Sequence, residues 1–355
     1  MIQILTGDCM DILPTLPAES VQCCVTSPPY WGLRDYGTAV WDGGDEECDH
    51  LEPQGGPSVK QESSNGTRNI QYRDTCAKCG ARRIDSQLGL ESTPEEYLEK
   101  MVAVFREVWR VLRNDGTLWV NMGDSYAANR TYQVTDNKHV DVGNNGASKI
   151  PPGLKPKDLC MMPARLAMAL QADGWYLRSD IIWHKPNPMP ESVTDRPTKS
   201  HEYIFLLAKR EHYYYDAASI YEQADPDNWR KSAGQRRYPG QSPDTGFLNG
   251  REYSHRNKRT VWTVATQPYS DAHFATFPED LIKPCIMAGS RVGDTVLDPF
   301  GGSGTTGKVA LELGRRSILI DLNPKYVELA KRRTNVTPSL FCLKRESPRQ
   351  CHLTG

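Results

Sequence analysis

The stretch D-T-V-L-D-P-F-G-G-S-G-T-T-G-K at residues 294–308 decides the fold. It consists of a short apolar strand that ends at Asp298, a glycine-rich turn, and the start of a helix over 305–313. In such a unit the N–H groups at the helix N-terminus face a ligand. A second unit follows directly, with a strand over 317–321 and a helix that Asn323 caps. Two successive units of this kind predict an α/β fold.

Further strands and helices precede these two units. The clearest helix covers 94–112, where Thr93 is the expected N-cap and Glu96 completes a capping box. Its apolar residues recur at helical spacing. The other predicted elements are a helix over 163–172 and strands over 2–5, 21–25, 117–121, 178–183 and 202–208. This alternation of strands and helices predicts an α/β sheet.

Composition excludes several classes of protein. The 43 Lys and Arg against 44 Asp and Glu give a net charge of −1, which excludes a histone-like polycation but not a local DNA-binding face. No apolar run approaches the roughly 18–20 residues of a membrane span, and the first residues contain no secretory signal. The ten cysteines are scattered, unlike a secreted disulfide framework, so we expect a cytoplasmic protein.

The sequence of the glycine-rich turn at 299–308 limits which class of ligand it can bind. Its glycines fit the dinucleotide pattern and also begin a Walker A loop, but Val309 lacks the hydroxyl that would bind Mg²⁺. Asp298 before the turn would repel a phosphate and suits a cationic group instead. Asp321, 23 residues further on, suits ribose hydroxyls. The pattern favours S-adenosylmethionine over two alternatives, a nucleotide phosphate site and a turn that only packs helix on strand.

A second motif, T-S-P-P-Y at 26–30, follows the predicted strand at 21–25. Consecutive prolines hold the backbone rigid, so the Pro28 carbonyl is a fixed acceptor beside the Ser27 hydroxyl. Tyr30 adds an aromatic surface on which a planar base can stack. Two acceptors and a stacking ring suit the exocyclic amine of a nucleobase, although a purely structural turn is the simpler alternative.

In this order the two motifs resemble the circularly permuted beta class of S-adenosylmethionine-dependent amino-group DNA methyltransferases. T-S-P-P-Y-W at 26–31 resembles their catalytic motif, V-L-D-P-F-G-G-S-G-T-T at 296–306 their cofactor loop, and I-L-I-D-L-N-P at 318–324 their ribose-binding strand end. Three further segments are similar to those near the adenine, the methionine moiety and the target base: L-T-G-D at 5–8, H-F-A-T-F-P at 273–278 and I-W-H-K-P-N at 182–187.

The resemblance implies a Rossmann-like, mostly parallel sheet of seven strands in permuted order. It implies as catalytic residues Ser27, Pro28, Pro29 and Tyr30. It implies as cofactor-binding residues Asp8, Phe277, Pro278, Asp298, Pro299, Phe300, Gly301, Gly302, Ser303, Gly304, Thr305, Thr306, Asp321 and Asn323. The expected division is a core of 1–36, 88–215 and 262–335, a zinc-binding insertion at 37–87, a target-recognition region at 216–261 and a tail at 336–355.

The resemblance also implies the reaction. In this class, serine at the position of Ser27 commonly accompanies cytosine N4 methylation, whereas Asp or Asn accompanies adenine N6 methylation. Ser27 therefore favours N4-methylcytosine as the product, and N6-methyladenine is the alternative. Either base would have to be flipped out of double-stranded DNA. Two other hypotheses are less favoured than a DNA methyltransferase. They are a catalytically silent DNA-binding protein and a methyltransferase that acts on RNA or protein. A cognate restriction endonuclease, and a monomer or a homodimer, are both compatible with the sequence.

Four possible metal ligands lie in the polar stretch at 37–87. Cys48 and His50 form one pair, and Cys76 and Cys79 form another, with Gly80 available for a turn. Three cysteines and one histidine are a common ligand set of structural zinc sites. We therefore expect zinc to order this segment, the alternative being unrelated thiols in a polar loop.

A basic stretch at 228–259 is the expected DNA contact. Aromatic residues interleave with the cations, a mixture that suits phosphates, guanine edges and unpaired bases. The predicted DNA-binding residues are Lys185, Arg230, Arg236, Arg237, Arg251, Arg256, Lys258 and Arg259. A solvated, charge-rich loop is the alternative interpretation of this stretch.

Overall fold

The computed structural model describes residues 1–32, 38, 40–50, 75–84, 86–127, 153–224, 255–267 and 277–334. The chain divides into two compact units. The first consists of the described residues within Met1–Pro28, Leu98–Asp124 and Leu159–Gly355, and the second of those within Pro29–Tyr97 and Ser125–Asp158. The boundary between them falls inside the T-S-P-P-Y motif, between Pro28 and Pro29.

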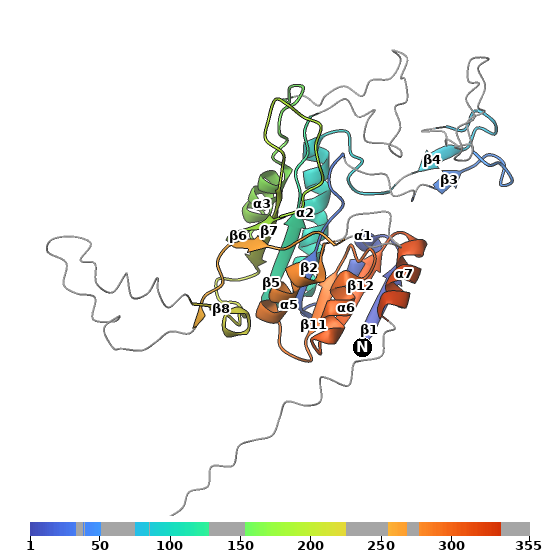
Figure 1. The fold of residues 1–355 in the computed structure, drawn as a ribbon. Coiled ribbons are helices and arrows are strands. Elements are labelled where there is room, and N and C mark those ends of the chain that lie inside the picture. The colour runs from blue at the N-terminus through green and yellow to red at the C-terminus, as the bar shows by residue number, and fades with distance from the viewer. Residues whose placement is uncertain are drawn as a thin grey trace, which may run out of the picture. The chain divides into compact units, whose positions relative to one another are not determined.

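The first unit is built on a sheet of eight strands in the order β1-β12-β11-β2-β5-β7-β6-β10 (Figure 1). Their bounds are β1 Ile2–Thr6, β12 Arg316–Asp321, β11 Thr295–Asp298, β2 Val21–Thr26, β5 Leu112–Met122, β7 His201–Ala208, β6 Tyr176–His184 and β10 Val261–Thr263. The first five strands in this order, β1, β12, β11, β2 and β5, are parallel to one another. Strand β7 is antiparallel to both of its neighbours, and β10 is parallel to β6. The predicted mostly parallel α/β sheet is confirmed.

The order of the strands shows the permutation directly. The N-terminal strand β1 pairs with the late strand β12, so that Thr6 lies beside Asp321. The late strand β11 in turn pairs with the early strand β2. Early and late strands therefore meet in the same half of the sheet, and the carboxyl ends of β1, β12, β11 and β2 share one edge. In open parallel sheets ligands bind beyond this edge.

The central strand β2 is buried along its whole length. Every residue of β2, V-Q-C-C-V-T, is buried, as expected for a parallel strand covered on both faces.

The α-helices within the described residues are α1 Cys9–Ile12, α2 Pro94–Val111, α3 Met162–Ala172, α5 Glu279–Gly289, α6 Thr305–Glu312 and α7 Pro324–Thr334. Helices α5, α6 and α7 pack side by side, and α6 and α7 lie against β11, β12 and β1 (Figure 1). In the part of the chain that the structure describes, no helix is both long and apolar enough to cross a bilayer.

The second unit contains a small antiparallel pair, β3 Val40–Asp42 and β4 Arg82–Ile84. Elsewhere it includes the start of α2, whose predicted cap is present: the Thr93 hydroxyl accepts a bond from the Glu96 N–H at 3.2 Å. The Glu96 carboxylate bonds the Ser92 N–H, one residue before the position that a capping box requires.

Several elements differ from the sequence expectation. Helix α5 was not predicted, and β5 begins at Leu112 directly after α2 instead of at residue 117. The eighth strand is the three-residue β10, and a second short pair, β8 Glu222–Gln223 with β9 His255–Arg256, lies near it in the chain. By their contacts within the chain, the described residues of 29–32, 88–97, 125–127 and 153–158 fall in one compact unit with 40–50 and 75–84. The expected division into core and insertions stays a prediction. The tail at 336–355 lies outside the described residues.

Candidate functional site

The glycine-rich loop between β11 and α6 has both close-packed and open positions. A Cβ on Gly304 would lie 2.9 Å from the Ala330 Cβ, and one on Gly307 would lie 2.7 Å from Leu319 Cδ1. These two glycines therefore allow α6 to pack closely. Gly302 differs, because its φ is +49° and the nearest atom to an added Cβ is 3.9 Å away. The backbone at Gly302 is thus bare and faces space, which fits a loop that receives a ligand.

Asp298, at the end of β11, is bound on both carboxylate oxygens by the chain itself. Thr26 donates to Oδ1 at 2.6 Å and Thr306 donates to Oδ2 at 2.7 Å, while the Phe300 N–H donates to Oδ1 at 3.1 Å. The residue is only 1% exposed, and burial raises the pKa of its carboxyl to about 6. The carboxylate joins the glycine loop to the end of β2, which leads into the T-S-P-P-Y motif. Its predicted contact with a cationic ligand stays a prediction.

Asp321, at the end of β12, holds the other side of the loop. Its carboxylate accepts bonds from the N–H groups of Gly302 and Asn323, both at 2.8 Å. Burial raises the pKa of Asp321. A carboxylate has about four acceptor positions, so Asp321 retains capacity for a ribose hydroxyl. The Gly7 N–H donates to the Asp321 carbonyl at 3.0 Å, which brings neighbouring Asp8 to the same edge.

An ion-pair network that the sequence did not reveal clamps the loop. Arg333 of α7 donates to the hydroxyls of Ser303 and Thr305, both at 2.9 Å, and to Glu279 at 2.7 Å. Lys308 donates to the other Glu279 oxygen at 2.6 Å. Burial alone would raise the pKa of Glu279, but the bonds from Lys308 and Arg333 lower it overall.

This clamp connects two cofactor segments predicted from the sequence. Glu279 directly follows Phe277 and Pro278, so the network ties that segment to the glycine loop. Lys308, which a Walker A interpretation would place on a phosphate, is instead bound to Glu279 and Glu312. Only the adjacency of Glu279 to Pro278 could have drawn attention to these residues in the sequence, because their meeting depends on tertiary packing.

The predicted catalytic motif, T-S-P-P-Y at 26–30, begins in the first unit and continues in the second. Thr26 is buried at the end of β2 and joined to Asp298, so Ser27 and Pro28 leave the sheet directly beside the glycine loop. In the second unit the Pro29 carbonyl accepts a bond from the Tyr97 hydroxyl at 2.8 Å. A Cβ on Gly89 would lie 3.0 Å from the Tyr30 carbonyl. The backbone at Pro29 and Tyr30 is therefore held against the segment that leads into α2.

Lys185 lies at the end of β6 in a polar cluster. Its ammonium is ion-paired with Glu202 and lies 4.2 Å from the centre of the Trp183 ring. Glu202 also accepts a bond from Asn121 of β5 at 3.2 Å. Lys185 is therefore paired with Glu202, and its predicted contact with DNA stays a prediction.

The predicted basic stretch is only partly described. Arg256, Lys258 and Arg259 surround Glu222, with N···O distances of 3.4, 3.9 and 3.1 Å. Three cations share this acid, so the described part of the stretch has a local positive excess. The remaining predicted residues, Arg230, Arg236, Arg237 and Arg251, lie outside the described residues.

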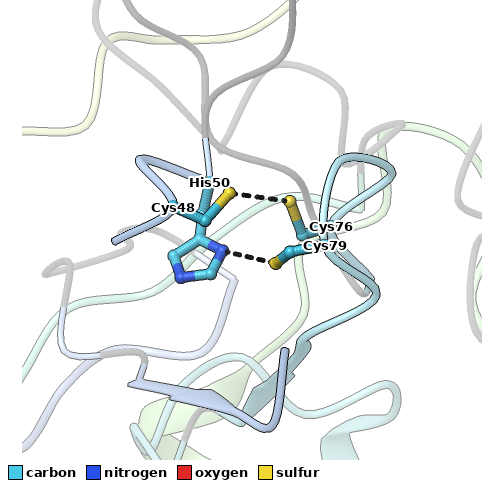
Figure 2. A group of neighbouring side chains, drawn as sticks. All are labelled: Cys48, His50, Cys76 and Cys79. Atoms are coloured by element: carbon cyan, nitrogen blue, oxygen red, sulfur yellow. Dashed lines mark hydrogen bonds between the residues drawn. The ribbon is translucent and has the colours of Figure 1, made fainter. Parts of the chain in front are cut away.

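The four predicted metal ligands come together in the second unit. Figure 2 shows Cys48, His50, Cys76 and Cys79 directed toward one another. Their possible ligand atoms all lie within 4.8 Å of one another. The Sγ atoms of Cys48 and Cys76 are 3.7 Å apart, and Cys79 Sγ is 3.5 Å from His50 Nδ1. Two ligand pairs far apart in the sequence are thus gathered into one cluster.

Comparison with known proteins agrees with this geometry. Residues 21–332 match the N6/N4 methyltransferase family, described as DNA methylase. The type II methyltransferase M.Cfr9I of Citrobacter freundii is 44% identical over 331 residues, 93% of this chain and 86% of that protein. The type II methyltransferase M.SmaI of Serratia marcescens is 42% identical over 93% of this chain and 90% of that protein.

Solved structures show the same fold at lower identity. The PvuII cytosine-N4-specific DNA methyltransferase matches with a TM-score of 0.56 at 18% identity, over 95% of this chain and 88% of that one. A candidate DNA modification methylase of Thermus thermophilus, complexed with S-adenosyl-L-methionine, matches with a TM-score of 0.51 at 23% identity, over 94% of this chain and 93% of that one. Fold, motifs and sequence similarity agree, and the chain belongs to the N6/N4 DNA methylase family of S-adenosylmethionine-dependent DNA methyltransferases.

Proposed function

We propose that this protein transfers a methyl group from S-adenosylmethionine to the exocyclic N4 amine of cytosine within a specific site in double-stranded DNA. The observation that carries the proposal is the bond between Thr26 and Asp298. It joins the T-S-P-P-Y segment to the glycine loop at one sheet edge, so that the amine acceptors and the methyl donor can meet there.

The chain's own groups have simple tasks in this reaction. The Ser27 hydroxyl and the Pro28 carbonyl accept the two amine hydrogens, which directs the nitrogen lone pair away from the ring plane. Tyr30 provides the surface on which the flipped base stacks. S-adenosylmethionine supplies an electrophilic methyl group. A carbon–nitrogen bond forms as the carbon–sulfur bond breaks, and the extra proton of the amine passes to water. Positioning accounts for most of the rate.

Cytosine is favoured over adenine for two reasons. Ser27 occupies the position where the family's N4-specific members commonly carry serine. The PvuII enzyme, a cytosine-N4-specific methyltransferase, shares the fold. The family covers both bases, so transfer to adenine N6 is the second candidate.

The test is to incubate purified protein with S-adenosylmethionine and unmethylated duplex DNA of mixed sequence, then analyse the nucleosides by mass spectrometry. N4-methylcytosine is the expected product. N6-methyladenine without N4-methylcytosine would replace the proposed base with the second candidate. RNA and peptide substrates form parallel arms, and transfer to either with none to duplex DNA would contradict the proposal.

The remaining assignments belong to the same proposal. The basic stretch at 228–259 contacts DNA and carries target recognition, and a cognate restriction endonuclease cuts the same site when the DNA is unmethylated. The enzyme acts in the cytoplasm of a prokaryotic or phage-infected cell, where its substrate is. It works as a monomer or a homodimer. A structural Zn²⁺ ion on the Cys48–His50–Cys76–Cys79 cluster is its second cofactor.

A further inference from the structure

We infer that a single tetrahedral Zn²⁺ ion on Cys48, His50, Cys76 and Cys79 is the main stabilising element of the β3–β4 pair, and that its loss unfolds this segment while the cofactor site stays intact. The inference about the metal depends on the cluster alone. Its consequence for methylation rests on the function proposed above.

Two distances between the ligand atoms match the edges of a zinc tetrahedron, and all four atoms lie within 4.8 Å of one another. Zinc binds thiolate sulfur at about 2.3 Å and imidazole nitrogen at about 2.0–2.1 Å. At tetrahedral angles these bonds place two sulfurs about 3.8 Å apart, and a sulfur and a nitrogen about 3.6 Å apart. The observed distances are 3.7 Å between the Cys48 and Cys76 sulfurs and 3.5 Å between Cys79 Sγ and His50 Nδ1 (Figure 2). A disulfide would need about 2.05 Å, so the sulfurs are spaced for a shared ion.

The backbone around Cys76 and Cys79 forms a tight turn suited to a metal. Gly80 has a φ of +76°, and its N–H donates to the Cys76 carbonyl at 2.8 Å. The Cys76 N–H donates to the Ala81 carbonyl at 2.8 Å and closes the turn. Backbone N–H groups of Asp45 and Ala81 are directed at the Cys79 sulfur.

The opposite side of the cluster is shaped for the same purpose. A Cβ on Gly44 would lie 2.8 Å from Cys79 Sγ, so only glycine lets this loop pass so near the sulfur. The His50 ring stacks on Trp41 of β3, with centroids 4.4 Å apart and planes 17° apart. Stacking orients the imidazole, and such outer contacts commonly hold a metal-binding histidine in place.

Among the residues that the structure describes, the β3–β4 pair has few large buried side chains of its own. Each strand has three residues, and the central residue of each is only half-buried. Isolated two-stranded pairs are marginally stable in water. Near the cluster, Cys76 and Ala81 are buried, but neither is large enough to form a core. A set of three thiolates and one imidazole is soft and closed, which selects zinc in a structural role. Metal binding would then supply the folding free energy.

A consequence for activity follows from the composition of the second unit. This compact unit contains the cluster and also Pro29 and Tyr30, whereas the glycine loop, Asp298 and Asp321 belong to the first unit. We therefore expect zinc loss to reduce methyl transfer to DNA several-fold or more and to leave S-adenosylmethionine binding within about twofold of the native value.

The experiment uses the full chain purified without chelator. Elemental analysis should give one zinc per chain, and His50→Ala should reduce it at least tenfold. His50→Cys restores a four-ligand set and should retain the metal, which separates ligand loss from general misfolding. Lys78→Ala is the matched control. Lys78 lies between Cys76 and Cys79 in the same turn and pairs with Asp49. Because Lys78 is not one of the four ligands, its loss should not change the zinc content. Hydrogen exchange should show faster exchange at 40–50 and 75–84 in His50→Ala only.

Several results would overturn the inference. They are less than half an equivalent of zinc in the native chain, iron in place of zinc, an unchanged zinc content in His50→Ala, or unchanged exchange at 40–50 after metal loss. Failure of the proposed function would look different. A chain that retains one zinc per molecule and binds S-adenosylmethionine but methylates no DNA would leave the metal site standing and would contradict only the function.

Discussion

At the scale of single residues, Asp298 shows how a motif residue can act through its neighbours. Its carboxylate is buried and accepts bonds from Thr26, Thr306 and Phe300. The sequence correctly placed it at the end of a strand before the glycines, and its contact with the cofactor stays a prediction. The bonds from the two threonine hydroxyls give it a further task, which is to join the glycine loop to the end of β2. No local pattern encodes this contact, because Thr26 and Asp298 are 272 residues apart.

This environment makes the stability of the protein depend on pH. Burial raises the pKa of Asp298 from 3.8 to about 6, so the folded chain binds this proton more tightly than the unfolded chain. The resulting stabilisation is present below about pH 4 and is lost as the pH rises through about 6. Asp298→Asn removes the titration. The stability of Asp298→Asn relative to the native protein should therefore increase between about pH 4 and 7, by up to about 3 kcal/mol.

Urea denaturation of both proteins without cofactor, at several pH values, measures this difference. Asp280→Asn, an exposed carboxylate on α5, is the control for a surface change. A difference between native protein and Asp298→Asn that stays constant over the whole range would show that Asp298 does not titrate as a buried acid.

At the scale of elements, the glycine loop is held by helices that follow it and precede it. Arg333 reaches it from the last turn of α7, and Glu279 from the first turn of α5. Helix α5 escaped prediction because Pro284 lies inside it, and a proline normally argues against a helix interior. Strands β3 and β4 escaped because three-residue strands are too short to show a periodic pattern.

The clamp predicts a specific effect on cofactor affinity. Arg333→Gln removes charge-assisted bonds to Ser303, Thr305 and Glu279, so the loop should lose its fixed conformation. Hydrogen bonds to charged groups contribute about 1.5–3 kcal/mol each, so we expect the Kd for S-adenosylmethionine to rise about tenfold or more. Titration calorimetry measures it. Arg332→Gln removes the same charge from the exposed neighbouring position and should leave the affinity unchanged; equal effects of both variants would refute the clamp.

The contact between α2 and the catalytic motif predicts a different effect. Tyr97→Phe removes the hydroxyl that bonds the Pro29 carbonyl and keeps the buried ring. Loss of one hydrogen bond of about 1 kcal/mol should lower kcat about fivefold through misplaced backbone. The KM for S-adenosylmethionine should stay unchanged. Steady-state assays separate the two constants, and a change in KM alone would show that Tyr97 does not position the motif.

At the scale of the whole molecule, the predicted cofactor residues lie in the first unit, whereas the T-S-P-P-Y motif is divided between the two units. The glycine loop, Asp298 and Asp321 lie in the first unit, whereas Tyr30 and the Cys/His cluster lie in the second. The peptide bond between Pro28 and Pro29 joins the units within the catalytic motif. The net charge of −1 therefore hides a local concentration of basic residues at 228–259.

The roles proposed for the motif residues predict that cofactor binding and turnover can be separated. Ser27→Ala and Tyr30→Ala should lower methyl transfer to duplex DNA about 100-fold, because positioning of the base is lost. Both should bind S-adenosylmethionine within about twofold of the native protein. Radiolabelled methyl transfer and calorimetry test the two halves. Near-normal turnover in either variant would show that the role proposed for that residue is wrong.

Most of the sheet and the motif residues of the site could be predicted from the sequence. Apolar runs and glycine turns specify strands and their ends locally, since each follows from the preferences of a few adjacent residues. Ser27, Asp298 and Asp321 were located in this way at strand ends, whereas the four Cys and His residues were identified from their paired spacing in a polar stretch. Arg333 and Glu279 could not be identified, because their meeting requires α7 and α5 to pack beside the loop.

The sequence by itself determined the class of sheet, the motifs at its carboxyl edge and the ligand pairs of the cluster. Only the tertiary structure decided that Asp298 bonds Thr26, that Glu202 neutralises Lys185, and that two distant ligand pairs gather into one cluster. The physical reason is the distance along the chain over which each interaction acts. Strand and turn preferences act over a few residues, whereas hydrogen bonds and ion pairs form between groups that only the folded chain brings within about 3 Å.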